Sequence, residues 1–151
     1  KMTDLQAALG LSQLRKLAGF IARRREIAEL YGKTLRTLGL PAPAAPGDCE
    51  PVWYRYVLTL DGDAEPFIDE MKRRGVECRR PVFKPLHRYL GLSGYAASEE
   101  AWRRAVSVPL YPALTGAEIE TILKALRLVL PRHCAGSAEA GRARGQAGRA
   151  C

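Results

Sequence analysis

Apolar side chains recur at helical spacing at the start of the chain. Thr3 and Gln6 form a capping-box pattern, so we expect a helix that begins near Thr3 and runs to about Leu38. In its first half the apolar residues occupy more than one face, which predicts burial from two sides. Such a helix spans roughly 50 Å, more than a core of this size covers, so part of its surface should meet something outside the chain. Gly10 in this stretch indicates the close approach of another backbone.

A loop and then a strand, helix, strand unit are expected in the middle of the chain. Residues 39–51 are rich in proline and glycine and cannot continue a helix. β-Branched and aromatic residues predict a strand from Val52 to Leu60. An amphipathic pattern predicts a helix from Pro66 to Arg74, and an extended run from Val76 to Phe83 follows.

The next segment, residues 84–94, has no clean period and is expected to be a loop of the kind that often carries function. Ser98 should cap a short helix that holds Trp102. A short extended run is expected from Val106 to Leu110.

A final helix is expected after a second capping box. Thr115 and Glu118 form this box, and the helix should run from Ile119 to Leu130 and end at Pro131. The order helix, strand, helix, strand, helix, strand, helix predicts an α/β (α+β) fold with a small sheet flanked by helices.

These elements divide the chain into three parts. Residues 1–38 should form a long linking or interface helix, and residues 39–131 a small α/β domain. Residues 132–151 form a Gly/Ala/Arg tail with almost no large apolar side chains, which predicts disorder.

Composition and charge narrow the function classes. The chain has 151 residues, 47% of them hydrophobic and 26% charged, which allows one cored domain with appendages. The net charge is +8, and the tail supplies three of these charges, four arginines minus Glu139. Most of the rest lie in clusters such as Arg23–Arg25 and Arg103–Arg104, without aromatic residues between them. A solvated helix face or a site for an anionic small molecule explains these clusters at least as well as nucleic acid does.

Several other features are missing from the sequence. There is no apolar run of about eighteen residues and no basic-then-apolar leader, so we expect a cytoplasmic protein with no membrane association. The four cysteines are widely spaced, which indicates neither a metal site nor a redox pair. Without a Gly-rich phosphate loop or a nucleophile elbow, we expect no catalytic residue and no complete active site in the chain.

His87 is the histidine that lies in the expected loop, among basic and aromatic residues. A lone loop histidine is more often structural or merely exposed than functional. From spacing alone, both interpretations stay open.

Four motifs carry a resemblance to a known family. The chain opens with KMTDLQAALGLSQL and contains the run Trp53-Tyr54-Arg55-Tyr56. It then has Pro-Val-Phe-Lys-Pro-Leu-His ending at His87, and Ser-Val-Pro-Leu-Tyr-Pro followed by Leu114-Thr115. In this order, over residues 1–130, the motifs resemble the DegT/DnrJ/StrS-type sugar aminotransferases. Four motifs in register are far more specific than any one of them.

The resemblance implies the C-terminal small domain of a fold-type I pyridoxal-phosphate enzyme that acts as a dimer. Such enzymes transfer an amino group from glutamate to the keto group of a nucleotide-linked sugar, through a lysine Schiff base in the large domain. None of the six lysines here lies in a segment that resembles the Schiff-base motif. We therefore expect this chain alone to bind no cofactor and to be inactive, within a larger enzyme of polysaccharide biosynthesis.

The resemblance also implies a set of site residues. His87 matches a histidine near the sugar-nucleotide site. Arg79, Arg80 and Lys84 are candidates for contacts with the diphosphate, and a solvated strand end explains these three residues equally well. Tyr54, in the second motif, is expected to join these substrate contacts. Lys1 stands where the family has an arginine next to a cofactor contact, which makes it cofactor-proximal but without the arginine fork.

Two alternatives remain open for the chain. Beside the aminotransferase domain, the chain could be a truncated, non-catalytic module whose basic tail contacts nucleic acid, or a module whose first helix drives dimerisation.

Overall fold

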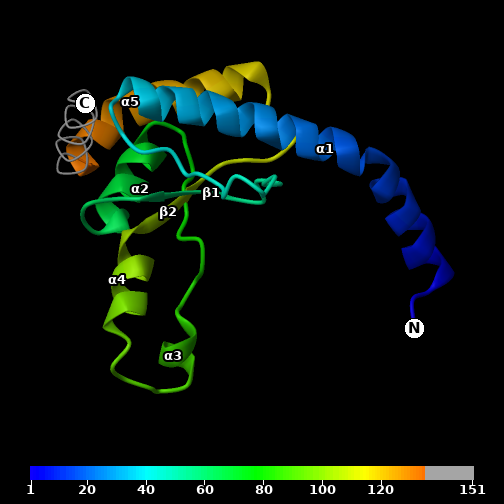
Figure 1. The fold of residues 1–151 in the computed structure, drawn as a ribbon, viewed down its shortest axis with the longest axis horizontal. Coiled ribbons are helices and arrows are strands. Elements are labelled where there is room, and N and C mark those ends of the chain that lie inside the picture. Colours follow the sequence, from blue (N-terminus) through cyan, green and yellow to red (C-terminus); the bar gives the residue numbers. More distant parts are fainter. Residues whose placement is uncertain (135–151) are drawn as a thin grey trace.

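The computed structural model describes residues 1–134 of the chain. Figure 1 shows a body of helices around a small sheet, with one long helix reaching out of it. The elements are α1 (Asp4–Thr37), β1 (Tyr56–Thr59), α2 (Ala64–Arg73), α3 (Leu86–Tyr89), α4 (Ala96–Arg104), β2 (Ala105–Val108) and α5 (Gly116–His133).

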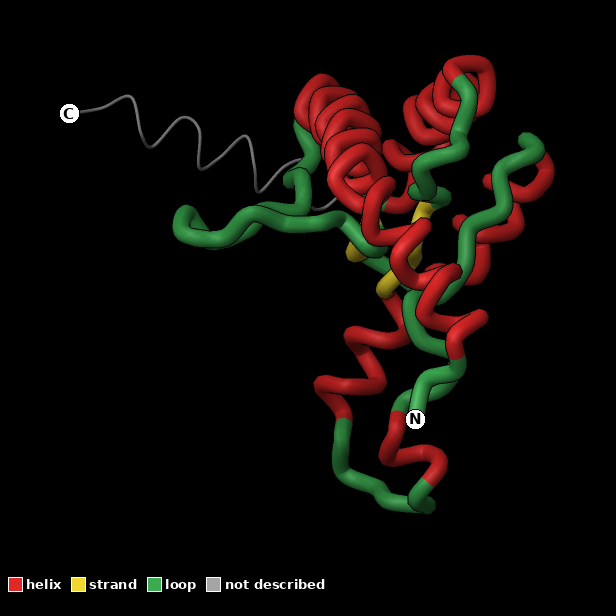
Figure 2. The backbone as a smooth tube through the Cα atoms, turned by 90° about the vertical axis from the view of Figure 1, so that its right-hand side faces the viewer, coloured by secondary structure: helices red, strands yellow, loops and turns green. Residues whose placement is uncertain are grey.

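The long helix α1 confirms the predicted first element and its capping box at Thr3. Its C-terminal half is buried through Ile27, Tyr31 and Leu35, whereas its N-terminal half projects beyond the body in Figures 1 and 2. No other described segment covers this first half, so its expected burial from two sides stays a prediction about neighbours outside the chain. No atom outside the helix lies within 4 Å of a side chain built at Gly10, so no other described segment approaches it.

The sheet is smaller than the sequence predicts. β1 and β2 pair antiparallel from Tyr56 opposite Val108 to Thr59 opposite Ala105. The expected strand from Val52 is shortened to four residues because the chain bends at Tyr54. The expected extended run from Val76 contributes one isolated bridge, Arg79 with Ser107, so the sheet has two strands.

The core lies between the sheet and the helices α1, α2 and α5. Alternating residues of both strands point into it, and α2 and α5 contact each other and flank it. Burial of these apolar side chains is the main stabilising contribution to the fold. The largest fully buried side chains are Ile27, Tyr31, Tyr56, Leu60, Phe67, Met71, Val106, Leu126, Val129 and Leu130.

Two predicted helix ends are wrong. Tyr95, not Ser98, is the N-cap of α4, and it makes no side-chain capping bond. Pro131 does not end α5, which continues to His133, because a proline in the last turn removes one hydrogen bond while the Cys134 N–H still donates to the Leu130 carbonyl at 3.0 Å. The second capping box, at Thr115, is confirmed.

The ordered body also extends beyond the predicted domain boundary at residue 131. Arg132 and His133 belong to α5, and Cys134 is buried in the core. The rest of the predicted tail, residues 135–151, lies outside the described residues. No helix among residues 1–134 is long and apolar enough to cross a membrane.

Candidate functional site

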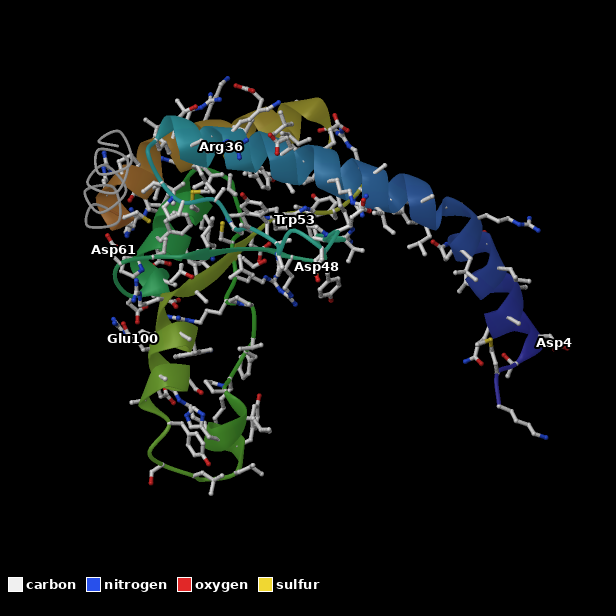
Figure 3. All side chains as sticks on the ribbon, viewed as in Figure 1. Asp4, Arg36, Asp48, Trp53, Asp61 and Glu100 are labelled. Carbon is white, nitrogen blue, oxygen red and sulfur yellow. The ribbon has the colours of Figure 1, made fainter. Side chains whose placement is uncertain are left out.

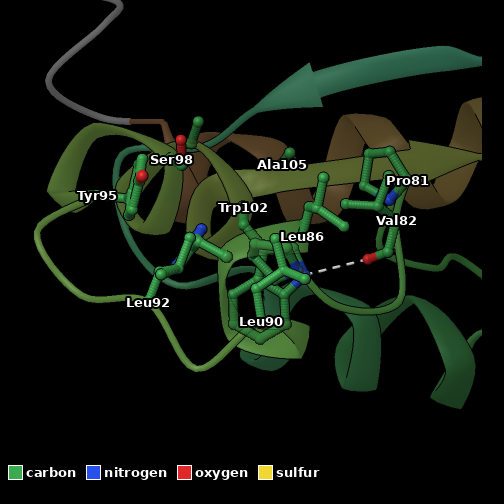
Figure 4. A pocket seen from close by; sticks show the side chains of 12 residues that line it. Pro81, Val82, Leu86, Leu90, Leu92, Tyr95, Ser98, Trp102 and Ala105 are labelled. Carbon is green, nitrogen blue, oxygen red and sulfur yellow. Dashed lines mark hydrogen bonds between the residues drawn. The ribbon is translucent and has the colours of Figure 1, made fainter.

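Residues 81–104 form a lobe that extends away from α1 and α5 (Figure 1). The segment predicted as a loop contains the four-residue helix α3, and neither α3 nor α4 has a buried residue. A largely apolar cavity of about 550 Å³ lies between the loop and α4 (Figure 4). Its lining consists of Pro81, Val82, Pro85, Leu86, His87, Leu90, Leu92, Tyr95, Ser98, Ala101, Trp102 and Ala105.

His87 faces the interior of this lobe rather than solvent. Its side chain is 10% exposed, and its Nε2 lies 2.6 Å from Glu99 Oε1. The imidazole stacks on the ring of Tyr95 with centroids 5.1 Å apart. Arg88 also binds the Glu99 carboxylate, through Nε at 2.6 Å and through Nη2. His87 therefore connects the loop to α4, and it also lines the cavity.

Trp102 connects the lobe to the body. Its ring is contacted by the guanidinium groups of Arg80 and Arg88, each 4.3 Å from the ring centroid. Its Nε1–H donates to the Val82 carbonyl at 3.1 Å, the dashed line in Figure 4. Cation–π contacts of this kind contribute about 0.5–2 kcal/mol each. They stabilise a lobe that has almost no buried apolar side chain.

The basic residues that the sequence places around His87 have different partners. Arg80 is 14% exposed and donates to the Trp102 carbonyl at 2.9 Å, to the Arg103 carbonyl at 2.7 Å and to Asp63 Oδ1 at 2.8 Å. Lys84 lies over the ring of Tyr89, 4.8 Å from its centroid. The donors of Arg80 are thus largely engaged within the protein.

Arg79 and Tyr54 lie at a second, smaller cleft of about 230 Å³. Arg79 pairs with Glu77 at 2.6 Å, and Ser107 and Arg55 also line the cleft. Lys1 is exposed at the tip of α1, beyond the body in Figure 1. These predicted site residues therefore lie in three places. His87 and Lys84 lie in the lobe, Tyr54 and Arg79 lie at the cleft, and Lys1 lies far from both.

The comparison with known families bears on what these sites do. The model of the DegT/DnrJ/EryC1/StrS aminotransferase family matches residues 1–127. The chain belongs to this family.

Three relatives show the range of the family. A dTDP-4-dehydro-2,3,6-trideoxy-D-glucose 4-aminotransferase of Saccharopolyspora spinosa is 32% identical, with 86% of this chain and 35% of the relative covered. A dTDP-4-dehydro-2,6-dideoxy-D-glucose 3-dehydratase of the same organism is 29% identical, covering 83% and 30%. The crystal structure of the aminotransferase TlmJ from Streptoalloteichus hindustanus superposes with a TM-score of 0.77 at 30% identity, covering 85% and 36%. The chain spans about a third of the length of the relatives it matches.

The family uses pyridoxal phosphate. A Schiff base needs a lysine whose amino group reaches an enclosed pocket. Five of the six lysines are exposed, and the sixth, Lys84, is half-buried against Tyr89. No lysine lines any of the four cavities described between residues 35 and 134.

Metal ligands and the buried thiols of Cys78 and Cys134 are the other groups to consider in the described residues. Among residues 1–134, no three His, Cys, Asp or Glu side chains gather in a way that could hold a metal ion. Desolvation by burial raises the pKa of Cys78 to about 12 and that of Cys134 to about 11, so both thiols stay protonated at neutral pH.

The arginine cluster on α1 has a role that the sequence analysis missed. Arg23 donates to the Leu114 carbonyl at 2.9 Å, and Arg25 donates to the Pro51 carbonyl at 3.2 Å. Arg24, between them, donates to the carbonyls of Trp53, Tyr54 and Leu110. The cluster binds loops to the helix rather than forming a solvated face. No sequence signal distinguishes these two roles, because an arginine cluster looks alike in both.

Proposed function

We propose that this chain is the C-terminal domain of a cytoplasmic, pyridoxal-phosphate-dependent aminotransferase that transfers an amino group from glutamate to a keto sugar linked to a nucleotide. The observation that carries the proposal is the family match over residues 1–127, together with coverage of only about a third of each relative. The lysines of this chain are exposed or half-buried, which favours a domain that assists the cofactor-binding part of the enzyme and catalyses nothing alone.

The domain would contribute substrate contacts from two places. Tyr54 and Arg79 at the cleft would meet the anionic part of the substrate, since a guanidinium group binds phosphate oxygens through a bidentate fork. His87 and Lys84 would act from the lobe, where His87 can hydrogen-bond a sugar hydroxyl at the cavity. Arg80 would act through the lobe it stabilises, and Lys1 would lie close to the cofactor in the complete enzyme.

The domain would also contribute a packing surface. The leucines of the projecting half of α1 are exposed, and so is Phe83 of the lobe, at 88%. Exposed apolar patches of this kind mark contacts with other protein surfaces. We propose that a second copy of the chain and the cofactor-binding part of the enzyme cover them, as in a homodimer. The leucines in question are Leu5, Leu9, Leu11, Leu14 and Leu17.

The test is to mix the purified chain with pyridoxal phosphate and to record its visible absorbance and amino transfer from glutamate to a nucleotide-linked keto sugar. We expect no stable, stoichiometric absorbance band and no transfer. A stoichiometric band would contradict a purely supporting role. One of the relatives is a dehydratase, so the complete enzyme has a further possible outcome. If the sugar loses water and gains no amino group, the proposed amino transfer is wrong and the reaction is a dehydration.

A further inference from the structure

The turn before β1 has an unusual backbone conformation. Trp53 has φ 50, and it is the one residue other than glycine with a positive φ in the part of the chain that the structure describes. Bulky side chains rarely adopt this left-handed conformation, so it persists only where the surroundings impose it. Figure 3 shows Trp53 below α1, in the segment that leads to β1.

Arg24 of α1 supplies contacts that hold this turn. Its Nη1 lies 3.1 Å from the Trp53 carbonyl, 3.0 Å from the Tyr54 carbonyl and 3.3 Å from the Leu110 carbonyl. The two successive carbonyls reach one nitrogen because the chain bends at Tyr54, directly after the left-handed residue. An ionised donor makes stronger hydrogen bonds than a neutral one, so Arg24 can offset the strain of the turn.

The turn places two neighbouring aromatic rings in different surroundings. The Trp53 ring packs against Tyr56, with centroids 5.2 Å apart. The Tyr54 side chain is 71% exposed, and the guanidinium group of Arg55 lies 5.5 Å from its ring centroid. Tyr54 and Arg55 both line this smaller cleft.

The charges at this cleft favour an anion. Arg79 is neutralised in part by Glu77, whereas Arg55 has no ion-pair partner among residues 1–134. An exposed guanidinium beside a tyrosine ring offers both charge and a hydroxyl donor to phosphate oxygens.

We propose that Arg24 is a positioning residue, which fixes the left-handed turn at Trp53 and so presents Tyr54 and Arg55 as a surface for the diphosphate of a ligand. The anion-binding part of this inference rests on the proposed function, whereas the control of the turn by Arg24 does not. Arg24 does not line the cleft, and its Nη1 is engaged with main-chain carbonyls, so it acts through the turn.

The first test follows the amide signals of Tyr54 and Arg55 by nuclear magnetic resonance while the full chain is titrated with pyrophosphate. We expect Arg24→Met to weaken pyrophosphate binding by about fivefold or more, because the loss of a charged donor releases the turn. The matched control is Arg25→Met, which removes a neighbouring arginine that binds the loop at Pro51, and it should leave the affinity unchanged. Arg24→Lys keeps one cationic donor and should recover part of the affinity.

The second test measures the coupling between Arg24 and the strained residue. Glycine adopts a positive φ without steric cost, so in Trp53→Gly the turn needs less support. Arg24→Met should therefore raise the unfolding equilibrium constant less in the Trp53→Gly background than in the wild type. The two increases should differ by a factor of about three or more. Equal effects in both backgrounds would overturn the positioning role.

The outcomes separate the two parts of the inference. Coupling without any pyrophosphate-dependent shift at Tyr54 and Arg55 in the wild type would keep the control of the turn and overturn the anion surface. Shifts that are the same in wild type and Arg24→Met would overturn the positioning role. A stoichiometric absorbance band with pyridoxal phosphate would contradict the purely supporting role of the chain without changing either readout.

Discussion

Arginine side chains make many of the polar links between distant segments of this domain. Arg24 binds three carbonyls from two segments, Arg80 binds two carbonyls of α4, and Arg104 donates to the Leu60 carbonyl at 2.5 Å. A guanidinium group has five donors in a planar fork and stays charged, which suits it to several acceptors at once. Because carbonyls are neutral, Arg24 keeps its positive charge uncompensated, whereas Arg80 also pairs with Asp63 and Arg104 with Glu100. Part of the net charge of +8 thus has a structural cause that does not require nucleic acid.

The carboxylate of Glu99 links the two helices of the lobe through its contacts with His87 and Arg88. Hydrogen bonds from Arg88 and from His87 lower the pKa of Glu99 from its usual 4.5 to about 2, against the opposite effect of desolvation. A carboxyl group with a lowered pKa stabilises the fold above its usual pKa, and this contribution is lost as the pH falls toward the folded-state value. Between about pH 5 and pH 2, the Tm of the wild type should fall more steeply than that of Glu99→Gln. Thermal unfolding followed by circular dichroism measures this.

A neighbouring carboxylate provides the control. Glu100 pairs with Arg103 and Arg104 on α4 and contacts neither His87 nor Arg88. Glu100→Gln should therefore follow the wild-type pH dependence more closely than Glu99→Gln does. Parallel curves for Glu99→Gln and the wild type would show that the ion pair contributes nothing to the lobe.

At the scale of elements, the same capping box occurs in two different contexts. Thr3 and Thr115 each accept a hydrogen bond from the backbone N–H three residues later, and the Gln6 and Glu118 side chains bond back to the cap. The first turn of α5 leads directly into the core at Ile119, whereas the first turns of α1 are exposed. Helix stability in proteins comes mainly from packing of the apolar face, so the two caps should differ in their effect on global stability.

Thr115→Ala is expected to lower the free energy of unfolding by about 1 kcal/mol, because α5 folds together with the core. Thr3→Ala should leave it unchanged in the isolated chain, since the first turns of α1 can fray without opening the core. Urea unfolding of both variants beside the wild type makes the comparison. Equal losses in the two variants would mean that the projecting half of α1 is part of the cooperative unit.

Periodicity and capping residues predicted the helices well, because both act locally along the chain. The strand that begins at Val52 was predicted too long. β-Propensity is a local preference, so it carries no information about the turn at Trp53 that Arg24 holds from a distant helix. The lobe was located from the motif ending at His87, but the pairing of that histidine with Glu99 depends on how two helices meet in space. The features of the candidate site that the sequence could not predict are therefore those that depend on contacts between distant segments.

At the scale of the whole molecule, the projecting half of α1 has two apolar faces. At 100° per residue, Leu5 and Leu9 lie on one side of the helix, whereas Leu11, Leu14 and Leu17 lie on another. None of these leucines is buried against any other described segment. A helix with two such faces needs two neighbours, which agrees with the proposed homodimer and with a further part of the enzyme.

The isolated chain is expected to self-associate through this helix. Burying a leucine side chain contributes about 1.5–3 kcal/mol, so the double variant Leu5→Ser, Leu9→Ser should raise the dissociation constant of the dimer about a hundredfold or more. Sedimentation velocity over a range of concentrations measures it. Leu128→Ser, at an exposed leucine on α5, is the matched control and should sediment as the wild type does. A wild-type chain that stays monomeric at high concentration would contradict dimerisation through this helix, because exposed leucines that form a contact between copies should bring the copies together as the concentration rises.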